Sequence, residues 1–265
     1  MKITVVQPKY YAGEKPDEII AEFLKNELSK TEENSLIVLP EYSNAGGLSE
    51  KEKELAALPR AKEMLDFASK IAKEKKAYVS INVIEERKGK IKNSTYLYGK
   101  DGKAAFVYDK IHLPPSEIAL GISRGEGNCI ADLDGIRFAF MTCYDVYYNE
   151  QIEYIAAHKP DIILIPGYQR GERTDIILAQ NKLAAFRCNA YIARSSFSMD
   201  DDNKGGNSMI VSPSGEILAN MGKEVGSISC EVDLKYKYMR TAGFGCGMVR
   251  NDDFINNGLC PEIFK

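Results

Sequence analysis

The sequence predicts an α/β fold, and three observations support this fold class. Short apolar runs such as ITVVQ (3–7) have the composition of buried strands. Segments with the 3.6-residue period of a helix lie between such runs. A strand–helix–strand unit occurs in each half of the chain, and such units favour a parallel core sheet with right-handed crossovers.

The first unit begins with ITVVQ. Its helix, KPDEIIAEFLKNELSK, places four apolar residues on one face: Ile20, Phe23, Leu24 and Leu28. Its second strand is SLIVLPEY (35–42). The second unit consists of a strand over 136–145, a helix over 149–159 and a strand over 161–168. LIVLPEY and IILIPGY share an apolar run, a proline and a tyrosine in register, so the two halves of the chain echo each other.

The remaining segments predict one more helix and several strands. A helix is expected over 59–76, where five apolar residues share a face: Met64, Leu65, Ala68, Ile71 and Ala72. The further strands are expected over 77–86, 94–100, 103–110, 191–198, 207–213, 215–221 and 227–234. This pattern fits either a large mixed sheet or two stacked sheets with helices outside, and the residue pattern leaves both open.

Length and composition predict a single domain over residues 1–265. The chain has 265 residues, 44% of them hydrophobic, which suffices for one large core. No Pro/Gly/Ser-rich linker divides it. Residues 235–265 contain the segment GFGCG and have no clear period. We expect them to form a C-terminal arm at a subunit interface, and therefore a homodimer or a higher homo-oligomer.

Charge and the N-terminal sequence exclude several classes of partner. The 35 basic and 38 acidic residues give a net charge of −3 and are mixed along helix faces, which argues against nucleic acid and anionic membranes as partners. The apolar run near the N-terminus is too short for a signal peptide, and no later run reaches membrane-spanning length. We therefore expect a cytoplasmic protein. The sequon Asn93-Ser94-Thr95 is interpreted as incidental in that compartment.

The sequence predicts neither a metal site nor a cofactor. Its six cysteines form no C-x-x-C pair, and no histidine stands at metal-ligand spacing, so a zinc site and a disulfide framework are both disfavoured. GFGCGMVR lacks the third glycine of a dinucleotide-binding loop, and GISRGEGN lacks the lysine of a phosphate-binding loop.

Three residues that could carry chemistry stand at the ends of predicted strands. Glu41 follows LIVLP directly, and Cys143 ends FAFMTC in the equivalent place. Open α/β sheets place ligand sites at the carboxyl ends of their strands. Lys110 ends KAAFVYDK, where the following LPP forces the chain into a loop. Taken singly, each has a plainer interpretation: a solvated carboxylate, a solvated strand end and a small buried cysteine.

The chain contains only two histidines that could activate a cysteine nucleophile. His158 is expected at a helix C-terminus, where it complements the helix dipole. His112 lies beside Lys110 in a turn and could approach Cys143 as its base. This alternative stays open at the level of sequence.

The three residues stand in sequence blocks, and these blocks resemble the nitrilase (carbon-nitrogen hydrolase) superfamily, in its amidase and carbamoylase branch. The blocks are LPEY with Glu41, DKIHL with Lys110 and MTCYD with Cys143. Later segments, including DIILIPG and GGNSMIVSPSGEILA, resemble further family blocks in the same order, so the resemblance covers nearly the whole chain. It implies a four-layer αββα sandwich that pairs with a second subunit.

The resemblance also implies a cofactor-independent reaction on a small molecule. A thiol with an ordinary pKa near 8.5 is mostly protonated at neutral pH, so a base must take its proton. By resemblance, Glu41 is that base and Lys110 stabilises the thiolate and the oxyanion. Cys143 attacks an amide or carbamoyl carbon, a thioester forms with release of ammonia or amine, and water then releases the acid. The backbone N–H of Tyr144 is expected as the second oxyanion donor. Glu117, in PPSE (114–117), matches a further family glutamate that positions the lysine or the substrate, although this segment could also be an exposed turn.

The chain departs from the family pattern beside the nucleophile. Many members have an arginine four residues after the cysteine, where this chain has Tyr147. That arginine often binds a substrate carboxylate, so its absence argues against a small keto-acid amide unless another cation substitutes. Arg170 or Arg173, after the strand IILIP, could supply that cation, or could simply lie in a solvated loop. Tyr147, Tyr148 and Tyr168 near the site would suit a small, partly apolar substrate, although they could equally serve packing.

Two further hypotheses remain beside hydrolysis of an amide or N-carbamoyl compound. The same three residues could hydrolyse a nitrile, since the difference lies in the geometry of the pocket. A non-catalytic scaffold that keeps the fold is disfavoured, because Glu41, Lys110 and Cys143 are all present.

Overall fold

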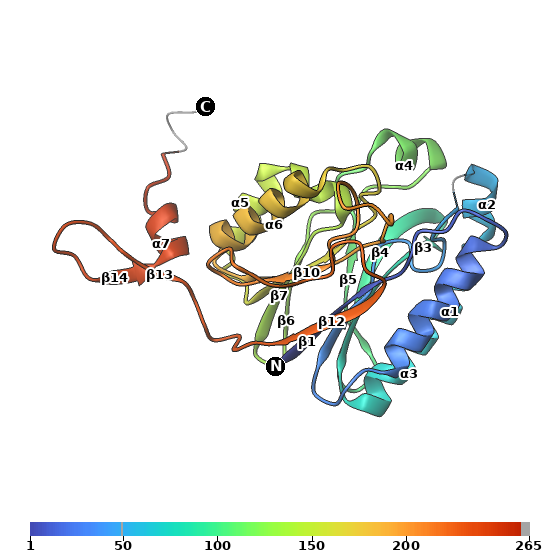
Figure 1. The fold of residues 1–265 in the computed structure, drawn as a ribbon, viewed down its shortest axis with the longest axis horizontal. Coiled ribbons are helices and arrows are strands. Elements are labelled where there is room, and N and C mark those ends of the chain that lie inside the picture. Colours follow the sequence, from blue (N-terminus) through green and yellow to red (C-terminus); the bar gives the residue numbers. More distant parts are fainter. Residues whose placement is uncertain (49, 261–265) are drawn as a thin grey trace.

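The computed structural model describes residues 1–48 and 50–260, and its body consists of two six-stranded sheets with helices on both outer sides (Figure 1). The sheets face each other, because β1 packs on β9 and β3 on β8. This arrangement is the predicted four-layer αββα sandwich. It also settles the choice between one mixed sheet and two stacked sheets in favour of two.

The first sheet has a parallel centre and antiparallel edges. In spatial order its strands are β12 (Gly226–Glu231), β1 (Lys2–Gln7), β2 (Leu36–Val38), β3 (Tyr78–Arg87), β4 (Lys90–Tyr98) and β5 (Ala104–Asp109). β1, β2 and β3 run parallel, and β4 and β5 follow as antiparallel neighbours. Because β4 is antiparallel to β3 and β5 is antiparallel to β4, β5 runs in the same direction as β2 and β3.

The second sheet repeats this plan from the second half of the chain. Its strands, in spatial order, are β11 (Ile217–Asn220), β10 (Met209–Val211), β9 (Tyr191–Ser195), β8 (Ile162–Pro166), β7 (Ile136–Phe140) and β6 (Ile130–Leu133). β7, β8 and β9 run parallel. The echo between the two halves of the sequence therefore corresponds to two similar sheets, each with three parallel strands at its centre.

Two pairs of helices cover the outer faces. α1 (Pro16–Ser29) and α3 (Arg60–Lys75) lie on the first sheet, and α5 (Asn149–Ala157) and α6 (Thr174–Cys188) lie on the second. The apolar stripe predicted for α1 is the buried one, because Ile20, Leu24 and Leu28 join a cluster with strand residues such as Ile37. The largest cluster lies between the sheets and reaches under α5 and α6.

The structure corrects several predicted boundaries. β2 ends at Val38 and β7 at Phe140, whereas the sequence predicted strands running to residues 42 and 145. In both places the chain turns sharply: residues 41–47 form turns, and a 3₁₀ helix, η1, spans Cys143–Tyr147. In the body of the molecule, two short helices were not predicted, α2 (Lys51–Ala56) and α4 (Pro115–Leu120). Of the described helices, none is both long enough and apolar enough to cross a membrane.

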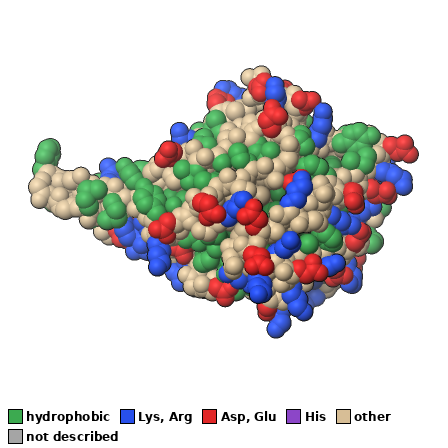
Figure 2. Space-filling view, turned by 60° about the horizontal axis from the view of Figure 1, so that its bottom comes forward, with side chains coloured by type: hydrophobic (Ala, Val, Ile, Leu, Met, Phe, Trp, Pro, Cys, Tyr) green, Lys and Arg blue, Asp and Glu red, His purple; other side chains and the backbone are tan. Residues whose placement is uncertain are grey.

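After β12 the chain leaves the body and forms a projecting arm (Figure 1). The arm contains β13 (Met239–Thr241), β14 (Met248–Arg250) and α7 (Asn251–Asn256). Several of its apolar side chains are exposed, and Phe244 is completely so. In Figure 2 green side chains accordingly lie along this extension at the left. The last part of the predicted arm, 261–265, lies outside the described residues.

Candidate active site

The ends of three strands bring Glu41, Lys110 and Cys143 to one cavity. Glu41 follows β2 and Lys110 follows β5, two strands of the first sheet that run in the same direction. Cys143 follows β7 of the second sheet. The cavity has a volume of about 390 Å³, and its lining residues are Glu41, Tyr42, Lys51, Glu54, Lys110, Pro114, Ser116, Glu117, Ala119, Leu120, Cys143, Tyr168 and Arg170.

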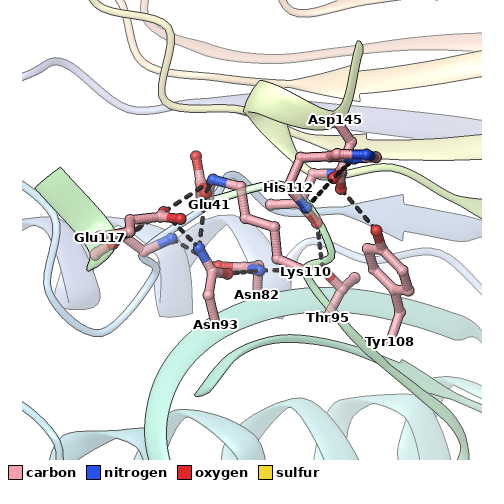
Figure 3. A network of polar contacts seen from close by, with 11 residues as sticks. Glu41, Asn82, Asn93, Thr95, Tyr108, Lys110, His112, Glu117 and Asp145 are labelled. Carbon is pink, nitrogen blue, oxygen red and sulfur yellow. Dashed lines mark hydrogen bonds and ion pairs between the residues drawn. The ribbon is translucent and has the colours of Figure 1, made fainter. Parts of the chain in front are cut away.

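The carboxylates of Glu41 and Glu117 share two hydrogen-bond donors (Figure 3). Lys110 Nζ lies 2.8 Å from Glu41 Oε1 and 2.8 Å from Glu117 Oε1. Asn93 Nδ2 donates to the same two oxygens, at 2.8 and 2.9 Å. Glu41 and Lys110 are each 1% exposed. Buried charges are tolerated when they are paired and hydrogen-bonded, and this network satisfies that condition.

The sequence reasoning missed the polar side chains under this network. Asn93, interpreted from sequence as part of an incidental sequon, is 1% exposed. Its side-chain oxygen Oδ1 accepts from Asn82 Nδ2 at 2.7 Å, and the same Nδ2 donates to Thr95 Oγ1 at 3.0 Å. Asn82 Oδ1 in turn accepts from the backbone N–H of Tyr42 at 2.9 Å, next to Glu41. The asparagine inside the apolar run of β3, YVSINVIEER, was a signal that could have identified Asn82.

Glu117 lies in α4, which the sequence had suggested could be an exposed turn. The structure buries its side chain at the cavity instead, and the Tyr42 hydroxyl donates to Oε1 at 3.1 Å. Among the described residues, its other oxygen, Oε2, is buried and has no partner. Burial, together with the negative charge of Glu41, raises the pKa of Glu117 to about 7 against the lowering effect of Lys110.

The turn that carries Cys143 is held in a strained conformation. Cys143 has φ 48°, a left-handed backbone that non-glycine residues seldom adopt. Asp145 stabilises the turn: its Oδ2 accepts from the backbone N–H of Thr142 at 2.7 Å and from the Tyr108 hydroxyl at 2.7 Å. The backbone N–H of Tyr144 donates to no backbone carbonyl in the part of the chain that the structure describes. That N–H is therefore free to meet a ligand.

His112 is turned toward two carboxylates, so it is not placed to act as the base for Cys143. Its Nδ1 lies 2.9 Å from Asp145 Oδ1, and its Nε2 lies 3.0 Å from Glu150 Oε1. These contacts raise the pKa of His112, with the hydrogen bond to Asp145 as the largest cause. The alternative that the sequence left open is thus not supported. His158 caps the C-terminus of α5, as the sequence predicted.

The electrostatics of the cavity leave Cys143 as a thiol beside a cation. Burial raises the pKa of Cys143 well above its ordinary value, and the charge of Glu41 adds to this effect. Lys110 and the backbone N–H of Tyr168 act in the opposite direction. Burial lowers the pKa of Lys110, but the negative charges of Glu41 and Glu117 outweigh this effect, so the pKa of Lys110 is raised. A base is therefore needed before the thiol can attack.

The other predicted residues divide between the cavity and the surface. Tyr168 lines the cavity, stacks on Tyr42 with ring centroids 5.4 Å apart, and accepts a hydrogen bond from the backbone N–H of Gly47. Arg170 also lines the cavity. Tyr147 does not, and its hydroxyl donates to Glu172. Arg173 is largely exposed and pairs with Asp175.

With this geometry in place, comparison with known proteins decides the family. The family model described as carbon-nitrogen hydrolase matches residues 2–238. The chain belongs to the carbon-nitrogen hydrolase family. The resemblance to the nitrilase superfamily is thereby confirmed, and the protein is a carbon-nitrogen hydrolase enzyme.

Curated relatives of the hydrolase are amidases. The 2-oxoglutaramate amidase of Bacillus subtilis (strain 168) is 27% identical over 232 residues, which are 83% of this chain and 86% of the relative. The omega-amidase of Homo sapiens is 29% identical over 182 residues, which are 63% of this chain and 65% of the relative. Together with the family, these relatives support amide hydrolysis as the general activity.

Solved structures similar to the hydrolase share its fold. A carbon-nitrogen hydrolase from Helicobacter pylori G27 matches with a TM-score of 0.74 and 20% identity, over 89% of this chain and 90% of that one. A variant of the amidase from Nesterenkonia AN1, of the nitrilase superfamily, matches with a TM-score of 0.77 and 15% identity, over 100% of this chain and 95% of that one. The αββα sandwich is therefore shared with nitrilase-superfamily proteins.

Proposed function

We propose that the hydrolase cleaves the C–N bond of a small primary carboxamide through a thioester on Cys143, with release of ammonia. The observation that carries this proposal is the convergence of Glu41, Lys110 and Cys143 on one cavity of about 390 Å³. A cavity of this size suits a small molecule. The amidase names of the curated relatives favour amides over the other substrates that the sequence left open.

In the acylation step, Cys143 Sγ attacks the carbonyl carbon while its proton passes to Glu41. Because the pKa of the thiol is raised, transfer of this proton to a neighbouring carboxylate is what makes the sulfur nucleophilic. Lys110 Nζ and the backbone N–H of Tyr144 stabilise the negative charge that develops on the carbonyl oxygen. Glu41 then passes the proton to the leaving nitrogen, and ammonia departs as the thioester forms.

In the deacylation step, water attacks the thioester carbon. Glu41 takes one proton from the water, the bond between carbon and sulfur breaks, and the proton returns to the thiolate of Cys143. The products are a carboxylic acid and the free enzyme. Amide, water, acid and ammonia balance the reaction, so the proposal requires no metal and no cofactor. Glu117 positions Lys110, because both Glu41 and Glu117 accept from the same Nζ.

Nitriles and N-carbamoyl compounds are the alternative substrates, since the same three residues could attack either. A panel of small amides, N-carbamoyl amino acids and nitriles, assayed for ammonia release, separates them. The wild type is compared with Cys143→Ala and with the control Cys230→Ala, which removes another partly exposed thiol away from the cavity.

The expected result is turnover of amides by the wild type and by Cys230→Ala, and a loss of at least a thousandfold in Cys143→Ala, the scale on which removal of a nucleophile acts. Turnover only of nitriles, or only of carbamoyl compounds, would reassign the substrate. Amide turnover that survives in Cys143→Ala would refute the role of this thiol.

A further inference from the structure

The cavity carries a second pair of charges that the proposed chemistry does not use. Glu54, from α2, and Arg170, from the loop after β8, both line the cavity that holds Cys143. They are more than a hundred residues apart in the chain, and the fold brings them to one enclosure. Lys51 also lines it, but its Nζ donates to the backbone oxygen of Ala119 at 2.8 Å.

The guanidinium of Arg170 is held rigidly with part of its donor set unused. Its Cζ lies 4.6 Å from the ring centroid of Tyr168 and 5.1 Å from that of Tyr10. Nη1 donates to the Tyr10 hydroxyl at 2.8 Å. Within residues 1–48 and 50–260, neither Nε nor Nη2 of Arg170 donates a hydrogen bond. A fixed guanidinium with free N–H groups is the geometry that binds a carboxylate through two hydrogen bonds.

Glu54 is an unpaired carboxylate in the same cavity. It is half-buried, and among the described side chains it has neither an ion-pair partner nor a hydrogen-bond donor. Burial raises its pKa, and the charge of Arg170 opposes this rise. The charges of Glu54 and Arg170 thus interact electrostatically, although the two side chains form no ion pair. A carboxylate that is partly removed from water normally has a partner, and none of the described side chains is that partner.

We propose that the cavity selects zwitterionic amides, small carboxamides whose far end carries both an ammonium group and a carboxylate. Arg170 binds the carboxylate, Glu54 binds the ammonium, and the carboxamide lies at Cys143. The inference rests on the proposed function. It also accounts for the sequence departure at position 147: Tyr147 stands where many family members have an arginine, and Arg170 supplies the cation from another loop.

Four substrates that differ only in these two groups test the inference. L-glutamine carries both groups, glutaramate only the carboxylate, 4-aminobutanamide only the ammonium, and butanamide neither. L-asparagine, succinamate, 3-aminopropanamide and propanamide form the same set with a chain shorter by one methylene. Charge-assisted hydrogen bonds of this kind typically change affinity about tenfold or more. In at least one of the two sets, we expect kcat/KM for the zwitterionic amide to be at least tenfold higher than kcat/KM for each of the three other amides in that set.

Variants assign the two charges to their residues. Glu54→Gln should lower the ratio of kcat/KM for the zwitterion to that for the carboxylate-only amide at least tenfold. Arg170→Gln should lower the ratio of zwitterion to ammonium-only amide by a similar factor. Matched controls are Glu52→Gln, an exposed carboxylate of α2 outside the cavity lining, and Arg173→Gln, the exposed arginine that pairs with Asp175. Both controls should keep the wild-type ratios.

Two results would overturn the inference. One is a wild type that hydrolyses the uncharged or singly charged amides as well as the zwitterions. The other is a control variant that behaves like its test variant. This would be the case if the ratio of zwitterion to carboxylate-only amide fell equally in Glu54→Gln and Glu52→Gln, or if the ratio of zwitterion to ammonium-only amide fell equally in Arg170→Gln and Arg173→Gln. In either case Cys143-dependent turnover of the simpler amides would leave the proposed function intact. If no amide of either set releases ammonia in a Cys143-dependent way, the proposed function fails and this inference fails with it.

Discussion

At the scale of single residues, the site depends on one oxygen atom of Glu117 that accepts from three side chains. Lys110, Asn93 and Tyr42 all donate to Oε1, at 2.8, 2.9 and 3.1 Å. This shared acceptor holds Lys110 Nζ between the carboxylates of Glu41 and Glu117 (Figure 3), in the cavity that Cys143 also lines. The position of the cation, which the oxyanion would need, is therefore set by a residue in the short helix α4.

Glu117 should leave a signature in the pH profile of the enzyme. Because its pKa is raised to about 7, it loses its charge as the pH falls through that value, and its hold on Lys110 weakens. We expect kcat/KM to fall on the acidic side with an apparent pKa near 7. Glu117→Gln keeps an acceptor oxygen but has no ionisation, so it should lower kcat/KM roughly tenfold at pH 8 and remove this step.

The measurement is a pH profile of kcat/KM for the wild type and the variant on one amide. An acidic limb that keeps the same pKa in Glu117→Gln would assign that ionisation to another group, such as Glu41, or to the pair as a whole.

At the scale of secondary-structure elements, the sequence predicted well which polar residues follow the core strands, although not where those strands end, and it predicted the polar support poorly. Glu41 and Cys143 were found because each follows an apolar run that could only be a buried strand. Asn82 and Asn93 were missed because a single asparagine in a strand has no periodicity to distinguish it. Their role depends on pairing between β3 and β4, which places Asn93 beside Asn82 in space.

The two short helices of the body, α2 and α4, also left no clear local signal in the sequence. α2 and α4 have six residues each, too few for a helical period to emerge from the sequence. Both are held by the tertiary structure: Lys51 of α2 donates to the backbone of Ala119 in α4, and α4 brings Glu117 into the cavity. The residues proposed to recognise the substrate therefore lie mainly where local sequence signals are weakest, whereas the predicted nucleophile and base lie where they are strongest.

At the scale of the whole molecule, the arm packs on the body through α7 and α6 but carries apolar side chains that the body leaves uncovered. We interpret the protein as one domain whose residues from 235 onward meet a second copy. The exposed apolar residues of the arm support this proposal: Met239, Phe244, Met248, Phe254 and Leu259. A group of exposed apolar side chains on a projecting segment is typical of an interaction surface.

A substitution at Phe244 tests the arm without disturbing the fold. Its side chain is completely exposed, so Phe244→Asp should leave the thermal stability of the monomer unchanged. If Phe244 packs on a second copy, burying a charge there should weaken association by about 2 kcal/mol or more, which is roughly thirtyfold in Kd.

The measurement is sedimentation velocity over a range of concentrations. Val225→Asp, at an exposed apolar position on the body, is the control. A monomeric wild type, or an oligomer equally stable in Phe244→Asp, would contradict the assignment of the arm.

The central claim is that amide cleavage passes through a thioester on Cys143, and hydroxylamine tests it most directly. Hydroxylamine competes with water for a thioester and converts the acyl group into a hydroxamate, which can be measured beside ammonia release. We predict that hydroxamate replaces acid in proportion to the hydroxylamine concentration, and that Cys143→Ala forms neither product. Formation of acid alone at every hydroxylamine concentration, or hydroxamate formation that persists in Cys143→Ala, would contradict the account.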